Sequence, residues 1–334
     1  MIKDKWHQKY TEVVDAAASS EIAFLIKMHG TVARATFKFF SGKGIYYVPV
    51  PETTGSASSP MEPGSDSEPV KAIIDKQLVL LTDSAQFHLE YGCRSMKQGC
   101  FYYGHSFRDE HPDVRHLSQF SHAEAEIPGT LTDVKKLVEE YIKYITKIVW
   151  RDLKSELKTI PGTEEKINKL LDEKFAFKTI TFQEAYEKLR QYPEAFKKCT
   201  DSGWRITSFG EKKLLELMGD FIWIEHWDKL TVPFYQAYDL STNTTFNADL
   251  LFGIGEVVGA GQRHETAFEL QRALKEHGLS DGDYKWYIQL KEKYPMQTSG
   301  FGMGVERYLM WVLGVHDIRS VEIFPRNRLQ TGEV

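Results

Sequence analysis

The sequence contains few cysteines, no long apolar run and no strong excess of charge of either sign. Its three cysteines form no CxxC pair, so we expect no disulfide framework and a reducing cytoplasm. No uninterrupted apolar stretch approaches the roughly 18–20 residues of a membrane span, and "MIKDKWHQKY" lacks the apolar segment of a signal peptide. The net charge of -5 argues against a protein whose main task is to grip a nucleic-acid backbone. We therefore expect a soluble, cytoplasmic, globular protein.

The apolar content is sufficient for one large folded unit, because 42% of the 334 residues are hydrophobic. Helical periodicity is found over residues 10–40 and again from about Asp133. Strand-like runs are "GIYYVPVP", "KQLVLLT", "GCFYYGHSF", "SHAEAEI", "TVPFYQAYDLS" and "NADLLFGIGEVVGAGQR". Strands at both ends of the chain with helices between them predict an α+β fold built on an antiparallel sheet.

Two segments stand apart from this pattern. Residues 52–69 are rich in Gly, Ser, Pro and acid without periodicity, which predicts a mobile loop that closes as a lid. Residues 150–230 interleave lysine with glutamate and predict a helical insertion, in which Thr181 and Glu184 form a capping box. We expect the whole chain, residues 1–334, to form a single domain.

Residues 104–126, "GHSFRDEHPDVRHLSQFSHAEAE", concentrate arginine, histidine and acidic side chains. Four histidines suggest zinc, but the short paired spacings of structural zinc sites do not occur. A strand–loop–strand hairpin with basic residues at its tip suits a nucleoside triphosphate instead. Arg108 would then meet the α-phosphate, Phe120 would stack on the base, and Glu110 would lie near the base or a cation.

The segment "GFGMGVER" resembles the GxGxxG nucleotide fingerprint, with Arg307 where the third glycine belongs. An arginine there prevents the close helix–strand contact of that motif, and no βαβ unit surrounds it. A guanidinium beside exposed backbone N–H groups at a helix start is typical of a phosphate site. The alternative is a surface arginine in a tight turn.

The segment "DLLFGIGEVVGAGQR" places Asp249, Glu256 and Arg263 at intervals of seven. In a regular strand Asp249 and Glu256 would lie on opposite faces, unless Gly253 or Gly255 marks a bulge. Two nearby carboxylates would suit Mg²⁺, which also binds substrate phosphates. Arg263 could bind a carboxylate or an amide, although each residue taken alone fits an ordinary solvated charge.

Together these segments resemble the class II aminoacyl-tRNA synthetases. "FKFFSGKGIYYVPVP" is similar to their motif 1, "FRDE…RHLSQF" to motif 2 and "GFGMGVERYLMWVLGVHDIRSVEIFPR" to motif 3. "LTDSAQFHLE" resembles the asparaginyl-type strand "LTVSGQLYLE", and "GEVVGAGQRHE" resembles "GEIVGGSQREE", which indicates the aspartyl/asparaginyl subgroup. The resemblance covers roughly residues 30–130 and 232–328. It implies an antiparallel sheet of six to seven strands flanked by helices, and a homodimer formed through motif 1.

The resemblance also implies roles for individual residues. The catalytic residues would be Arg108, Arg307 and Glu256. The ATP-binding residues would be Arg108, Glu110, His116, Phe120, Glu256 and Arg307, with Mg²⁺ at Asp249 and Glu256. The amino-acid-binding residues would be Ser84, Gln86, Glu124 and Arg263. Leu89 stands where aspartyl enzymes carry a lysine, as in asparaginyl enzymes; Gln119 and Gly261 depart from the usual glutamate and serine.

Motif 1 begins near residue 30, which leaves no room before it for the anticodon-binding domain of this subgroup. We therefore expect a catalytic core without that domain, similar to the related asparagine synthetases. The favoured activity is tRNA-independent: an aspartate- or asparagine-like acid is activated as an acyl-adenylate and transferred to ammonia or another amine. The alternatives are a truncated asparaginyl-type enzyme that acylates tRNA or another carrier, and a non-catalytic regulatory paralogue.

Overall fold

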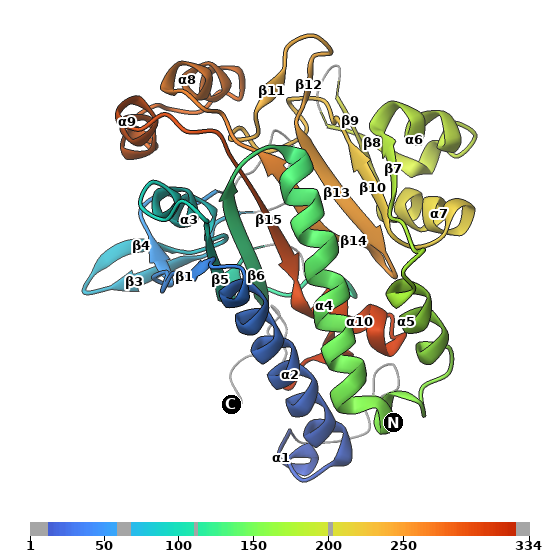
Figure 1. Ribbon diagram of the computed structural model, residues 1–334. Helices are drawn as coiled ribbons and strands as arrows, with labels where there is room; N and C mark the ends of the chain where they lie inside the picture. The colour runs from blue at the N-terminus through green and yellow to red at the C-terminus, as the bar shows by residue number, and fades with distance from the viewer. Residues whose placement is uncertain (1–12, 59–67, 110–112, 200–202, 325–334) are drawn as a thin grey trace.

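The centre of the protein is an eight-stranded sheet (Figure 1). The computed structural model describes residues 13–58, 68–109, 113–199 and 203–324. In spatial order the strands are β1 Tyr46–Tyr47, β5 Cys100–Phe107, β6 Gln119–Pro128, β15 Thr298–Gly304, β14 Gly255–Gln262, β13 Asn247–Phe252, β10 Ile222–Glu225 and β7 Lys178–Thr181. Only the outermost pairs, β1 with β5 and β7 with β10, are parallel. The prediction of an α+β fold dominated by antiparallel pairing is confirmed.

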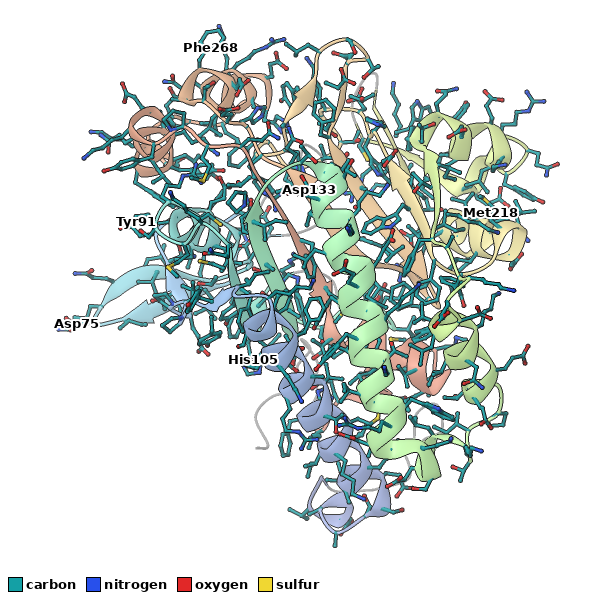
Figure 2. The ribbon with its side chains drawn as sticks, in the orientation of Figure 1. Asp75, Tyr91, His105, Asp133, Met218 and Phe268 are labelled. Carbon is teal, nitrogen blue, oxygen red and sulfur yellow. The ribbon has the colours of Figure 1, made fainter. Side chains whose placement is uncertain are left out.

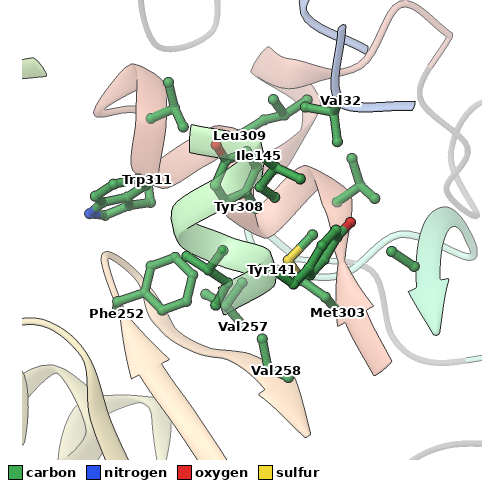
Figure 3. Close-up of a cluster of buried hydrophobic side chains, with 14 of the residues drawn as sticks. Val32, Tyr141, Ile145, Phe252, Val257, Val258, Met303, Tyr308, Leu309 and Trp311 are labelled. Carbon is green, nitrogen blue, oxygen red and sulfur yellow. The ribbon is translucent and has the colours of Figure 1, made fainter. Parts of the chain in front are cut away.

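Two long helices, α2 Ser20–Gly42 and α4 Leu131–Leu157, cover one face of the sheet side by side (Figure 1). Helix α4 begins at a capping box in which Thr130 accepts a hydrogen bond from the Asp133 N–H group. The stripe of apolar side chains that follows packs against β14, β15 and the helix α10 Val305–Leu313. Figure 3 shows Tyr141 and Ile145 of α4 among Phe252, Val258, Met303, Tyr308 and Trp311. Burial of this apolar stripe holds α4 against one face of the sheet.

The remaining elements surround the edges of the sheet (Figure 1). The helices are α1 Val13–Ala16, α3 Gln86–Cys93, α5 Thr163–Leu171, α6 Phe182–Leu189, α7 Ser208–Met218, α8 Ala267–Glu276 and α9 Lys285–Lys293. The small sheets are formed by β2 Thr53–Thr54, β4 Gln77–Leu81 and β3 Lys71–Ile74, by β8 Phe196–Lys198 and β9 Trp204–Ile206, and by β11 Tyr238–Asp239 and β12 Thr244–Thr245. Asp75 marks the tip of the β3–β4 hairpin (Figure 2). No helix within the described ranges is both long and apolar enough to cross a bilayer.

Several predicted elements differ from the structure. The segment "LTDSAQFHLE", predicted as a strand, ends in the helix α3. The predicted helical insertion is only partly helical, because β7 and β10 are strands of the central sheet. Ile222, Trp223 and Ile224 are fully buried there, which supplies the apolar contacts that a solvated helical insertion would lack. The predicted strands at residues 44–51 and 231–241 shrink to two residues each.

Part of the segment predicted as a mobile loop lies within the described residues and makes defined contacts there. Thr53–Thr54 pairs with β4, and the buried Ser58 donates hydrogen bonds to Asp83 from its N–H group (3.0 Å) and its hydroxyl (2.6 Å). Residues 59–67 lie outside the described residues. The first part of this segment is therefore tied to the loop that precedes α3.

Candidate active site

A cavity of about 370 Å³ lies on the face of the sheet opposite α4. The β5–β6 and β13–β14 hairpins, β15 and the start of α10 form its walls. Of the predicted site residues, those that line it are Ser84, Gln86, Arg108, His116, Phe120, Glu124, Asp249, Glu256, Arg263 and Arg307. Glu110, the remaining predicted residue, lies outside the described residues. Segments separated by more than two hundred positions in the sequence thus meet at one site.

Strand β6 supplies the floor through the alternation that the sequence predicts. His122, Glu124 and Glu126 line the cavity, whereas Ala123 packs into the core on the other face. Glu124 is buried, accepts a hydrogen bond from the N–H group of Ala85 (2.6 Å), and its Oε1 lies 2.5 Å from His122 Nδ1 in an ion pair. Burial raises the pKa of the Glu124 carboxyl, but the charge and hydrogen bond of His122 lower it further, so the net pKa lies below its usual value. Glu124 is therefore a carboxylate suited to an ammonium group.

The glycines of "GFGMGVER" make room for the acidic and histidine side chains of β6. A Cβ atom at Gly300 would overlap Glu126 Oε2, and one at Gly302 would lie 2.5 Å from His122 Nε2. Both glycines belong to the strand β15, which pairs with β6 in antiparallel register. Their function is to let two strands with large polar side chains on one face lie together.

One end of the cavity is closed by Arg263. Its guanidinium donates to Glu126 through Nε (3.2 Å) and Nη2 (3.0 Å) and to Gln236 Oε1 through Nη1 (3.0 Å). All three side chains are buried. Burial raises the pKa of Glu126 more than Arg263 lowers it, to about 7. The positive charge of Arg263 is thus partly balanced before any ligand binds.

A second buried pair supports this end from behind. Lys291 on α9 donates to Glu90 Oε2 on α3 (2.7 Å), and both side chains are fully buried. Glu90 also accepts hydrogen bonds from Gln86 Nε2 (2.9 Å) and from the Tyr287 hydroxyl. The main-chain N–H of Gln86 donates to Ser84 Oγ (3.2 Å). Gln86, a predicted amino-acid-binding residue at the start of α3, is therefore held by a charge pair that sequence reasoning missed.

The opposite end of the cavity is rich in arginine. The guanidinium of Arg108 lies over the Phe120 ring, 5.4 Å from its centroid. Arg307 Nη1 donates to the main-chain oxygen of Glu256 (2.9 Å) and lies 3.8 Å from Glu256 Oε2. His116 Nδ1 is 2.7 Å from Asp113 Oδ1. A planar ring beside converging guanidinium groups is chemistry suited to a nucleotide.

A β-bulge brings Asp249 and Glu256 to the same face of the sheet. The register between β13 and β14 shifts between Leu250 and Leu251, leaving Val257 as the extra residue. A Cβ atom at Gly259 would lie 3.5 Å from Glu256 Oε1 and 3.8 Å from Asp249 Oδ1. The two carboxylates therefore converge over a glycine that leaves room between them. These oxygen donors fit Mg²⁺.

The segment predicted as an insertion contributes charged residues that the sequence analysis did not identify. Arg205 of β9 lines the cavity, and Glu211 of α7 forms an ion pair with the buried Arg115 (2.7 Å). No pattern in the sequence marks either residue: Arg205 stands alone in "GWRITS", and Glu211 lies next to lysines in "GEKK".

The family model described as "tRNA synthetases class II (D, K and N)" matches residues 6–328 of the chain. The chain belongs to this family. The asparagine--tRNA ligase of Clostridium tetani (strain Massachusetts / E88) is 30% identical over 332 residues, which cover 92% of this chain and 71% of that protein. The asparaginyl-tRNA synthetase of Homo sapiens is 29% identical, over 90% of this chain and 66% of the human protein. The chain thus spans about two thirds of the length of these synthetases.

The crystal structure of asparaginyl-tRNA synthetase from Pyrococcus horikoshii complexed with asparaginyl-adenylate superposes with a TM-score of 0.82 at 26% identity. The superposition covers 93% of this chain and 70% of that synthetase. Membership of the family confirms the prediction of an ATP-dependent ligase that forms aminoacyl-adenylates.

The favoured prediction of a tRNA-independent amide ligase is wrong. The Clostridium tetani and human relatives, which match along most of the chain, are tRNA ligases for asparagine, and the Pyrococcus horikoshii structure holds asparaginyl-adenylate. The error arose from the position of motif 1 near the start of the sequence, which says nothing about the acceptor. The tRNA synthetase alternative accounts better for these relatives.

Proposed function

We propose that this protein activates asparagine with ATP to form asparaginyl-adenylate and then transfers the asparaginyl group to tRNA. The observation that carries the choice of amino acid is the charge balance around Arg263. Its guanidinium already makes hydrogen bonds to Glu126 and Gln236, and Lys291 is bonded to Glu90. Leu89, which also lines the cavity, adds an apolar contact. A neutral amide suits this end better than the second carboxylate of aspartate.

The orientation of asparagine follows from the acidic residue in the middle of the floor. Glu124 would accept the ammonium group, with Ser84 and Gln86 beside it, and the α-carboxylate would then point toward the arginine-rich end. There Phe120 would stack on adenine and Arg108 would contact the α-phosphate. The carboxylate oxygen would attack the α-phosphorus, and pyrophosphate would leave toward Arg307 and His116.

Asp249 and Glu256 would hold Mg²⁺ at the same end. Burial raises the pKa of Glu256, but the charges of Arg307, Arg205, Arg115 and Arg108 lower it below its usual value, so the carboxylate stays ionised. A bound Mg²⁺ would neutralise charge on the phosphate oxygens. The arginines would complete that neutralisation.

A homodimer formed through the motif 1 region is part of the same proposal. Phe37 of α2 and Tyr46 and Tyr47 of β1 expose large aromatic surface next to one another. Their exposed fractions are 38%, 57% and 42%, whereas Phe39 and Phe40 of the same helix are buried. A second copy covering this face would remove apolar surface from water.

The decisive experiment is exchange of labelled pyrophosphate into ATP without RNA, with either asparagine or aspartate. We expect exchange with asparagine and little with aspartate, followed by asparaginylation when tRNA is added. Exchange with aspartate alone would contradict the proposed substrate. Asparagine-dependent exchange without transfer to tRNA under any condition would contradict the proposed acceptor.

Replacing Phe120 by alanine should separate the two substrates. The stacking contact of an aromatic ring with a base contributes about 1–3 kcal/mol, so the KM for ATP should rise about tenfold or more. The KM for asparagine should change little, because Phe120 lies at the arginine-rich end. Steady-state exchange kinetics measure both constants. Equal increases in the two would mean that the ring only supports the fold of the cavity.

A further inference from the structure

The β8–β9 hairpin brings one positive charge from the 150–230 segment to the cavity. Arg205 is the middle residue of β9, is half-buried and lines the same cavity as Arg307. The next residue, Ile206, is buried in a core cluster with Ala195 and Leu214. Since neighbouring residues of a strand point to opposite faces, burial of Ile206 turns Arg205 toward the cavity.

The position of this hairpin is fixed by α7, which follows it directly. Thr207 donates its N–H to Ala195 O (2.9 Å), and its hydroxyl accepts the N–H of Gly210 (3.3 Å) to cap the helix. One turn later, Glu211 Oε2 accepts hydrogen bonds from Arg115 Nη2 (2.7 Å) and from the N–H of Glu256 (3.2 Å). The hairpin is therefore attached to the ATP end of the cavity through a well-buried ion pair.

A glycine makes this attachment possible. Gly255 has φ +129°, and a Cβ atom there would overlap Glu211 Oε2 and lie 2.8 Å from Arg115 Nη2. The absence of a side chain lets the helix start approach the β13–β14 turn closely. The contact is thus part of the architecture of the site, not a loose surface encounter.

The arginines and carboxylates at this end share one cavity. Arg205 lines it together with Arg108, Arg115 and Arg307, and the carboxylates of Asp249 and Glu256 line it as well. Glu211 forms an ion pair with Arg115, and Arg307 lies near Glu256. Several guanidinium groups beside a carboxylate pair suit phosphate oxygens.

We propose that Arg205 binds the β- and γ-phosphates of ATP and holds the departing pyrophosphate opposite Arg307. This inference rests on the proposed adenylate-forming function. It assigns to the 150–230 segment a part in the first half-reaction, in addition to its two strands of the central sheet. The same guanidinium chemistry could bind a phosphate of the tRNA acceptor end, so the test separates the two sources.

The variant Arg205→Ala is compared with wild type by calorimetric titration with pyrophosphate and with ATP, without amino acid or RNA. Loss of one charged hydrogen-bonding partner should raise the Kd for pyrophosphate about tenfold or more. In pyrophosphate exchange, the KM for ATP should rise similarly while the KM for asparagine stays unchanged. Arg205→Lys should recover part of the affinity. The control is Lys198→Ala, which removes an exposed charge from the other face of the same hairpin and should change nothing.

The outcomes are distinct. An unchanged Kd for pyrophosphate in Arg205→Ala, or a defect seen only in transfer to tRNA, overturns the inference. Equal losses of affinity in Arg205→Ala and Lys198→Ala overturn it as well, since they would indicate general disturbance of the hairpin. If wild type binds pyrophosphate through Arg205 but shows no exchange with asparagine, the inference stands and the proposed function fails.

Discussion

Replacing Arg307 by alanine should reduce asparagine-dependent exchange of pyrophosphate into ATP by about 100- to 1000-fold, the effect typical of removing one preorganised group that stabilises developing charge. The guanidinium lies at the start of α10, bonded to the main-chain oxygen of Glu256 and close to its carboxylate. Without it, negative charge that develops on the leaving pyrophosphate would lose one of its nearest partners. The turnover number should therefore fall more than the KM for asparagine rises.

The matched control for this variant is Arg151→Ala. Arg151 lies on α4 with 64% of its side chain exposed, where it pairs only with the neighbouring Asp152 among the described contacts. Exchange by the control should equal that of wild type, and thermal unfolding should show that both variants are folded. Near-normal exchange by Arg307→Ala would exclude it from the ATP site and with it the proposed orientation of the substrates.

Replacing Lys291 by methionine should lower the free energy of unfolding by about 3–5 kcal/mol, the range found when one partner of a buried ion pair is removed. Burial raises the pKa of Glu90, but the charges of Lys291, Arg263 and Arg94 lower it further, so Glu90 is ionised in the native protein. The variant would leave this carboxylate buried without its main partner. Denaturant unfolding followed by circular dichroism measures the loss.

The stability of Lys291→Met should also depend on pH in a way that reflects the unpaired Glu90 carboxylate. In Lys291→Met the folded-state pKa of Glu90 should rise. A carboxyl whose folded-state pKa is raised contributes stability at low pH, and this contribution is lost as the pH increases. The deficit relative to wild type should therefore shrink on acidification. Adding Glu90→Gln to the variant should recover stability at neutral pH. Lys293→Met, exposed on the same helix, is the control, and a loss of similar size there would contradict the prediction.

Local periodicity predicted the floor of the site well. The alternation that places His122, Glu124 and Glu126 on one face of β6 depends only on the geometry of a strand, which the sequence shows directly. The motifs, together with the subgroup segments around residues 81–90 and 249–263, identified ten of the residues that line the cavity. The chemistry expected of Arg307 and Phe120 followed from the same motifs, and the structure brings both to one end.

Contacts between distant segments were not predictable in this way. Phe87, Leu89 and Tyr91 alternate with polar residues as in a strand, yet α3 forms where Glu124 accepts the N–H group of Ala85 at its start. The composition of residues 150–230, rich in lysine and glutamate, did not indicate the strands β7 and β10. The burial of Trp223 in β10 depends on contacts with the rest of the sheet, which composition does not show. Glu211 and Lys291 act through partners far away in the sequence, and no local pattern records such a partner.

The bulge at Val257 has a consequence for which sequence changes the protein tolerates. Asp249 and Glu256 share a face only because β14 carries one residue more than β13 opposite it. A substitution between them that keeps the glycines alters packing alone, whereas the loss of a single residue would turn one carboxylate to the other side of the sheet. In this hairpin, length is therefore under stricter constraint than composition. In related sequences, the residues between Asp249 and Glu256 should vary in type while their spacing of seven positions stays the same.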